Sequence, residues 1–186
     1  DTGEKIGRIT SIGNQVTLLA NLLNHKNPDI VLVAGDREEA ISVTMTCAYL
    51  DIVVAHFFGG DIVKDGNIDN SARYASSKFA HIHFSSLPEH RETLMKLAED
   101  DFRIFVMGNP ALDRIASTRV LSKSEVLSNL GVKNKKISYY CVLIQHTTAQ
   151  ALKQDEKIRS TLNARLEYEG HSMINFHNSD LGYSET

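Results

Sequence analysis

Short runs of β-branched and aromatic residues alternate with amphipathic segments along most of this chain. The predicted strands cover residues 30–34, 52–55, 81–84 and 104–107, and the segments with helical spacing that follow the first three cover residues 38–50, 71–79 and 88–98. Strands that alternate with helices in this way are typical of βαβ units, whose consecutive strands are parallel. The pattern therefore predicts an α/β protein with a mainly parallel sheet.

Helix signals lie on both sides of this region. An amphipathic stretch at residues 16–23 predicts a helix before the first strand. Asn109-Pro110 is typical of a helix start, with proline at the first helical position, and predicts a helix over residues 111–116. Ser122 and Glu125 have the spacing of a capping box. Gly131 is placed to end that helix.

The pattern beyond the capping box resumes with a strand at 138–144, a long helix at 151–169 and a strand at 173–176. The intervening polar connector predicts a domain boundary. We assign residues 1–116 to part of a first Rossmann-like domain, residues 117–137 to a linker, and residues 138–186 to the start of a second Rossmann-like domain.

Composition narrows the classes of function. At 186 residues, the chain has room for one large domain or one and a half. Its 20 basic and 23 acidic residues are spread along the sequence, so no basic stripe predicts a nucleic-acid partner. No apolar run reaches the roughly 18 residues that span a bilayer, so we expect a cytoplasmic protein without a membrane partner. Cys47 and Cys141 lie in apolar segments and are expected to be free core thiols.

Polar and glycine residues gather where the predicted strands end. In open parallel sheets, ligands bind beyond the carboxyl ends of the strands. The residues there are Asp36-Arg37, His56 with Gly59-Gly60-Asp61, Ser85-Ser86, Gly108-Asn109, Gln145-His146 and His177-Asn178. Carboxylates, an imidazole, an arginine and glycine amides would converge if these ends share one crevice. Such a site suits an anionic, hydroxyl-rich ligand.

Each of these residues also has an ordinary structural interpretation. Asp36 could cap the helix that follows it, and Arg37 could be a surface ion-pair partner. Gly59-Gly60 could be a simple turn, because the pair lacks the spacing of a dinucleotide fingerprint.

Several other polar residues carry no recognisable signature. His81 and His83 alternate on one strand, but no cysteine or carboxylate at a recognisable spacing accompanies them, so we expect no metal site. His25, His90 and His171 are predicted to be solvated, and Glu99-Asp100-Asp101 to be a polar turn.

Several stretches, in the same order along the chain, resemble a known family. Residues 28–40, PDIVLVAGDREEA, resemble the PD-[hydrophobic]-GDR-E-A signature of UDP-N-acetylglucosamine 2-epimerases. Residues 55–61, 66–73 and 77–84 are similar to that family's ordered series H-x-x-GG-[DE], G-x-ID-x-x-x-R and [ST]K-x-x-H-x-HF. Residues 108–113 resemble the segment that leads to the second domain, and residues 145–146 and 178–182 resemble the QHP and NSDxG elements. An ordered series of this kind is highly specific.

The resemblance implies a glycosyltransferase-B-like fold, in which two Rossmann-like domains face a cleft. It covers nearly the whole chain but only about half of a typical member. The parts not covered include the first strands, with a phosphate-binding glycine-rich turn, and a serine-rich loop that binds uridine.

The implied activity is that of the hydrolysing members, which feed pathways such as sialic acid biosynthesis. Loss of the C2 proton expels UDP and leaves a 2-acetamidoglucal, to which water adds with inversion at C2. By motif match, Asp36 and Asp69 are the acid/base carboxylates, and His146 assists the leaving diphosphate. The implied substrate-binding residues are Arg37, His56, Gly59, Gly60, Asp61, Arg73, Gln145 and Asn178. The resemblance implies a UDP-sugar substrate, a homo-oligomer, and neither a metal nor a redox cofactor.

Three positions depart from the family pattern. Phe58 stands where many relatives have a catalytic glutamate, so Asp61 or Asp69 is expected to take over that role. Tyr74 and Thr147 replace a histidine after Arg73 and the proline of QHP.

The GG-[DE] form at Gly59-Gly60-Asp61 favours a hydrolysing enzyme over a non-hydrolysing one, whose form is H-x-EAG. The non-hydrolysing epimerase and a non-catalytic nucleotide-sugar-binding protein remain alternatives, and the sugar could carry one or two acetamido groups.

Overall fold

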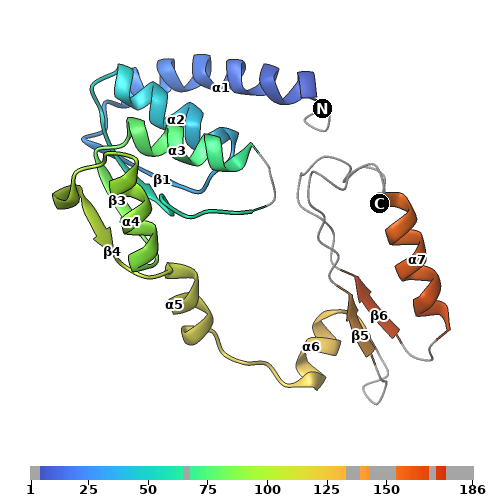
Figure 1. The fold of residues 1–186 in the computed structure, drawn as a ribbon. Coiled ribbons are helices and arrows are strands. Elements are labelled where there is room, and N and C mark those ends of the chain that lie inside the picture. The colour runs from blue at the N-terminus through green and yellow to red at the C-terminus, as the bar shows by residue number, and fades with distance from the viewer. Residues whose placement is uncertain (1–4, 65–67, 133–138, 143–153, 168–170, 175–186) are drawn as a thin grey trace. The chain divides into compact units, whose positions relative to one another are not determined.

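A computed structural model describes residues 5–64, 68–132, 139–142, 154–167 and 171–174. The chain divides into two compact units, residues 1–109 and 110–186 (Figure 1). Among the helices in these ranges, none combines the length and the apolar character that crossing a membrane requires.

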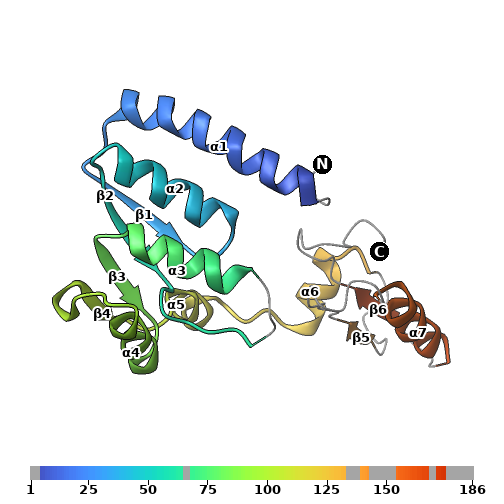
Figure 2. The same cartoon turned by 45° about the horizontal axis from the view of Figure 1, so that its top comes forward.

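The first unit contains a four-stranded parallel sheet with the strand order β1-β2-β3-β4. Its strands are β1 (Ile30–Ala34), β2 (Val53–Phe57), β3 (Ile82–Ser85) and β4 (Ile104–Val106). Its helices are α1 (Lys5–Lys26), α2 (Glu38–Tyr49), α3 (Asp69–Phe79), α4 (Pro88–Lys96) and the short 3-10 helix η1 (Asp101–Arg103). Helices α1, α2 and α3 lie side by side in both views (Figures 1 and 2). The predicted parallel α/β arrangement is confirmed.

The helices cover one face of this sheet. Connections between parallel neighbours are right-handed, so a consecutive strand order puts α2, α3 and α4 on the same side. Side chains facing them are buried, as Val33 and Val54 are, whereas Leu32 on the opposite face is 64% exposed. The core between helices and sheet is formed by Leu23, Val33, Ala40, Cys47, Ile52, Val54 and Ala80.

An aromatic row crosses the opposite face near the carboxyl ends of the strands. The ring centroids of Phe57 and Phe84 are 4.5 Å apart, and those of Phe84 and Phe105 are 6.0 Å apart. These residues are direct partners in the register of β2, β3 and β4. Cross-strand aromatic pairs stabilise a sheet, so the row reinforces the edge from which the polar turns extend.

Helix α1 is much longer than the predicted segment 16–23. The apolar spacing continues upstream through Ile6, Ile9 and Ile12 at intervals that fit a helix. Gly7 and Gly13 interrupt the pattern with weak helix formers, which explains why the prediction began too late.

Two boundaries near the candidate site also differ from the prediction. Strand β2 runs to Phe57 because Phe57 pairs with Ala34 on one side and with Phe84 on the other. His56 therefore lies inside a strand and not in the turn after it. Helix α3 starts at Asp69, two residues early, which puts the Asp69 carboxylate in its first turn.

The second unit contains α5 (Pro110–Ser117), α6 (Lys123–Asn129), β5 (Tyr139–Val142), α7 (Gln154–Leu166) and β6 (His171–Ile174). Strands β5 and β6 pair in parallel. The predicted capping box is confirmed: the amide of Glu125 donates to Ser122 Oγ at 3.3 Å, and the amide of Ser122 donates to a Glu125 carboxylate oxygen at 2.8 Å. The linker at 117–137 stays a prediction.

Glu99 was predicted to lie in a polar turn, but it is the centre of a buried ion cluster. Its side chain is 2% exposed, and its carboxylate oxygens lie 2.6 Å from Lys78 Nζ, 2.8 Å from Arg103 Nη2 and 3.1 Å from His83 Nε2. Burial alone would raise the pKa of Glu99, but the Lys78 hydrogen bond and the surrounding positive charges outweigh it and lower that pKa. Burial lowers the pKa of His83 more than the attraction of Glu99 raises it. The cluster joins the ends of α3, β3 and α4.

We expect Glu99→Gln to lower the free energy of unfolding by about 3 kcal/mol at pH 7, because it removes one partner from a buried set of charges. A carboxyl whose pKa is lowered by folding stabilises the protein above its unfolded-state pKa and loses that effect as the pH falls. The difference between wild type and variant should therefore shrink below about pH 4.5. Urea denaturation at several pH values measures it. Glu92→Gln on exposed α4 is the control, and a difference that does not change with pH would contradict the assignment.

Candidate functional site

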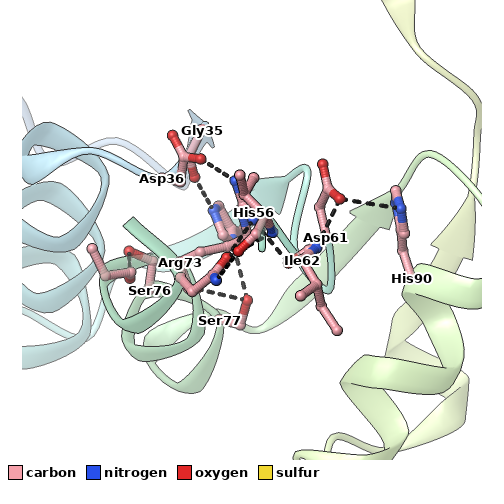
Figure 3. Close-up of polar contacts among 12 residues, drawn as sticks. Gly35, Asp36, His56, Asp61, Ile62, Arg73, Ser76, Ser77 and His90 are labelled. Carbon is pink, nitrogen blue, oxygen red and sulfur yellow. Dashed lines mark hydrogen bonds and ion pairs between the residues drawn. The ribbon is translucent and has the colours of Figure 1, made fainter. Parts of the chain in front are cut away.

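Arg73 of α3 connects the turns that follow β1 and β2. Its side chain is only 4% exposed, and its Nη2 donates to Asp36 Oδ2. Its Nη1 donates to the carbonyl oxygen of Asp61 at 2.8 Å and to Asn70 Oδ1 at 3.2 Å (Figure 3). One guanidinium thus brings two of the predicted site residues, Asp36 and Asp61, to the same place.

Asp36 is an oriented carboxylate and not a helix cap. The N-cap residue of α2 is Arg37, whose side chain makes no capping hydrogen bond, so the capping interpretation of Asp36 is wrong. A buried guanidinium needs a charged acceptor, and Asp36 supplies it while keeping 26% of its own side chain exposed. The carboxylate is therefore held by Arg73 and still partly accessible.

His56 supports the turn that carries Asp36. Its side chain is fully buried, with Nε2 2.8 Å from the Gly35 carbonyl oxygen and Nδ1 3.1 Å from Ser77 Oγ. Burial lowers the pKa of His56, and the bond to Gly35 only partly offsets this. A carbonyl can only accept, so the neutral ring donates from Nε2 to Gly35. Gly35 has a φ of 100°, which favours glycine, and the bond from His56 holds this turn in place. Direct contact of His56 with a ligand stays a prediction.

Close packing explains the glycine pair after β2. Gly60 has a φ of 81°, and a Cβ there would lie 2.1 Å from the carbonyl oxygen of His90. A Cβ on Gly59 would lie 2.9 Å from Ser77 Oγ. Both positions accept only glycine without movement of their neighbours. The approach of their amides to a ligand stays a prediction.

Asp61 has a partner that the sequence did not reveal. Its side chain is 44% exposed, and its Oδ1 accepts the amide of Ile62 at 2.7 Å and lies 3.4 Å from His90 Nε2. His90 is 17% exposed, so its prediction as a solvated histidine is wrong. It lies on α4, separated from Asp61 along the chain by α3 and β3, and nothing in the local pattern signals the pairing.

Asp36 and Asp69 line one cavity of about 460 Å³ between α1, α2 and α3. Its apolar walls are Ile9, Ile12, Ile41, Ile68, Ala72 and Ala75, and its other lining residues are Arg8, Glu38 and Ser71. Arg8 Nε binds Glu38 Oε1 at 2.5 Å, and this bond is the main cause that lowers the pKa of Glu38. The volume suits a small organic ligand. The sequence did not indicate Arg8 as a site residue, because the predicted helix began at residue 16 whereas α1 begins at Lys5.

The structure gathers part of the predicted site. Asp36, Asp61 and Arg73 meet through one guanidinium, and Asp69 shares the cavity with Asp36. Arg37 lies beside them at the start of α2. Gln145, His146 and Asn178 fall outside the described residues, so their roles stay predictions.

Comparisons with known proteins agree with these findings. The sequence model of the UDP-N-acetylglucosamine 2-epimerase family matches residues 2–184. The chain is 30% identical over 141 residues to UDP-N,N'-diacetylbacillosamine 2-epimerase (hydrolyzing) of Legionella pneumophila, covering 75% of this chain and 36% of the relative. It is 29% identical over 181 residues to UDP-N-acetylglucosamine 2-epimerase of Neisseria meningitidis, covering 97% of this chain and 46% of the relative. The chain spans less than half the length of these curated relatives.

Solved structures share the fold. UDP-GlcNAc 2-epimerase of Methanocaldococcus jannaschii, in complex with UDP-GlcNAc and UDP, aligns with a TM-score of 0.69 at 18% identity, covering 90% of this chain and 47% of that one. The Neisseria meningitidis enzyme bound to UDP-GlcNAc aligns with a TM-score of 0.65 at 15% identity, covering 96% of this chain and 51% of that one. These likenesses confirm the predicted α/β, glycosyltransferase-B-like fold class.

Proposed function

Because the chain belongs to the UDP-N-acetylglucosamine 2-epimerase family, we propose that the full-length protein is a hydrolysing 2-epimerase of a UDP-sugar. The observation that carries the proposal is the cavity shared by Asp36 and Asp69, with Arg73 holding Asp36 at its edge. In this proposal the reacting sugar lies against Asp36, and either Asp69 or Asp61 supplies the second carboxylate.

The chemistry requires more than one proton-transfer group. Removal of the C2 proton and departure of UDP from C1 form a C1–C2 double bond in the sugar. Water then adds its hydroxyl to C1 while a proton returns to C2 from the opposite face, which inverts C2. The overall change consumes one water, releases UDP and leaves the oxidation state of the sugar unchanged. A base on one face and an acid on the other satisfy this sequence.

We assign the proton transfers at C2 to Asp36 and a second carboxylate. Asp36 is oriented by the Arg73 guanidinium, whose Nη2 donates to Asp36 Oδ2. Asp69 lines the same cavity as Asp36, and the backbone carbonyl of Asp61 accepts a hydrogen bond from the same guanidinium. Either carboxylate can transfer the proton that the phenyl ring of Phe58 cannot. His146 is assigned to the leaving diphosphate by motif match alone.

The hydrolysing type is supported by two relatives. The Legionella protein and one from Campylobacter jejuni, which is 29% identical over 164 residues, are both described as hydrolysing. Both names specify N,N'-diacetylbacillosamine. This favours a second candidate substrate, a UDP-sugar with two acetamido groups, and the isoleucine walls of the cavity can bury an acetamido methyl group.

The test supplies the purified full-length protein with UDP-N-acetylglucosamine or, separately, with UDP-N,N'-diacetylbacillosamine. We expect free UDP and an equal amount of a free sugar inverted at C2, measured by chromatography and proton NMR. An inverted sugar that keeps its UDP would establish the non-hydrolysing alternative. Binding of both compounds without turnover would establish the non-catalytic one.

A further inference from the structure

The turn that carries Asp61 is held against α4 by backbone packing. The Cα of Gly60 lies so close to the carbonyl oxygen of His90 that a Cβ would be 2.1 Å from it, and 3.0 Å from Leu94 Cγ. The carbonyl of Asp61 accepts from Arg73 on the other side. The place of Asp61 beside His90 is therefore set by rigid elements and not by a chance side-chain conformation.

One oxygen of Asp61 is occupied and the other is directed away. Oδ1 receives the amide of Ile62 at 2.7 Å and lies 3.4 Å from His90 Nε2. Figure 3 shows both dashed contacts ending on this oxygen, while the second oxygen points away from His90 and Ile62. The Ile62 amide and the nearby His90 ring restrict rotation of the carboxyl group, and both contacts are made by Oδ1.

The imidazole has one tautomer that suits this place. Nδ1 of His90 is buried and has no hydrogen-bond partner within the described part of the chain. A hydrogen on Nδ1 would leave a buried donor unpaired, whereas a hydrogen on Nε2 faces the Asp61 carboxylate. The geometry thus selects the Nε2–H form.

The contact between His90 and Asp61 adds little to stability, because Asp61 is 44% exposed and exposed polar contacts are weak. Its effect is orientation. Resting on the proposed function, we propose that His90 is a positioning residue for Asp61, whose Nε2–H holds Oδ1 so that Oδ2 faces the reacting sugar. Nothing in the local sequence pattern marks His90 for this role.

The test compares variants of the full-length protein by UDP release. We expect His90→Leu to lower kcat at least tenfold, with KM changed less than about threefold and Tm close to wild type, because a carboxylate that is free to rotate is seldom aligned. His90→Gln keeps a side-chain N–H donor and should recover most of kcat. His25→Leu, an exposed histidine on α1, is the control and should match wild type.

A double-mutant cycle separates positioning from general structural damage. If His90 acts through Asp61, then His90→Leu has no further effect on kcat in an Asp61→Asn background. The same fold loss in both backgrounds, a His90→Leu variant within twofold of wild type, or a His90→Gln variant as impaired as His90→Leu would overturn the proposal.

Nitrogen-15 NMR of the histidine rings tests the pair when no UDP-sugar is turned over, so failure of the proposed function is distinguishable. We expect the Nε2–H tautomer for His90 and a change in its ring signals on Asp61→Asn. A hydrogen on Nδ1 of His90, or ring signals that do not change on Asp61→Asn, would overturn the assignment of the His90–Asp61 contact.

Discussion

Asp36→Asn in the full-length protein is expected to lower the rate of UDP release by about 10³-fold. The amide keeps the shape of the carboxylate and can still accept from Arg73, but it cannot take up a proton, and general acid–base groups contribute factors of this size. Asp36 also neutralises a guanidinium that is 4% exposed, so we expect a smaller loss of stability as well. Steady-state kinetics and thermal unfolding measure the two effects separately.

Asp29→Asn is the matched control for this experiment. Asp29 is an exposed aspartate at the opposite end of β1, and its substitution changes the same net charge. Its turnover should equal that of wild type. If Asp36→Asn retained a tenth or more of wild-type turnover, the assignment of Asp36 as a proton-transfer group would be wrong.

Gly60→Ala is expected to lower the free energy of unfolding by about 2–4 kcal/mol. The φ of 81° is unfavourable for any residue with a Cβ, at about 1 kcal/mol. The added methyl group would also lie 2.1 Å from the backbone oxygen of His90, so α4 or the turn must move, which costs about 1–3 kcal/mol more. Urea denaturation followed by circular dichroism measures the loss.

Gly108→Ala isolates the contribution of the backbone angle. Gly108 has a φ of 79°, almost that of Gly60, but a Cβ added there would meet no atom of the described residues within 4 Å. We expect it to lose only about 1 kcal/mol. Equal losses at the two positions would mean that the contact between Gly60 and α4 is not rigid.

The order of elements was predictable, whereas some of their ends were not. Strand β1 matches its prediction because a compact β-branched run is bounded by a proline and a glycine. Strand β2 extends through His56 and Phe57, which read as a turn until their pairing with β1 and β3 is known. The end of a strand depends on its neighbours as much as on its own residues.

Polar residues were likewise predicted only in part. Asp36 and Asp69 were found from motifs, and the structure places both on one cavity. Glu99 looked like a surface carboxylate, yet Lys78 and Arg103 enclose it. A charged residue is recognised as buried only when its partners are known.

By itself, the sequence determined the parallel α/β architecture, the family and the candidate carboxylates, because periodicity and motif order are properties of short segments. Only the tertiary structure decided which groups act on one another. Arg73 reaches Asp36 across 37 residues, and His90 reaches Asp61 from a different helix. Such contacts depend on how helices pack on the sheet. The side chains that meet there are far apart in the sequence, so no local sequence pattern predicts their contact.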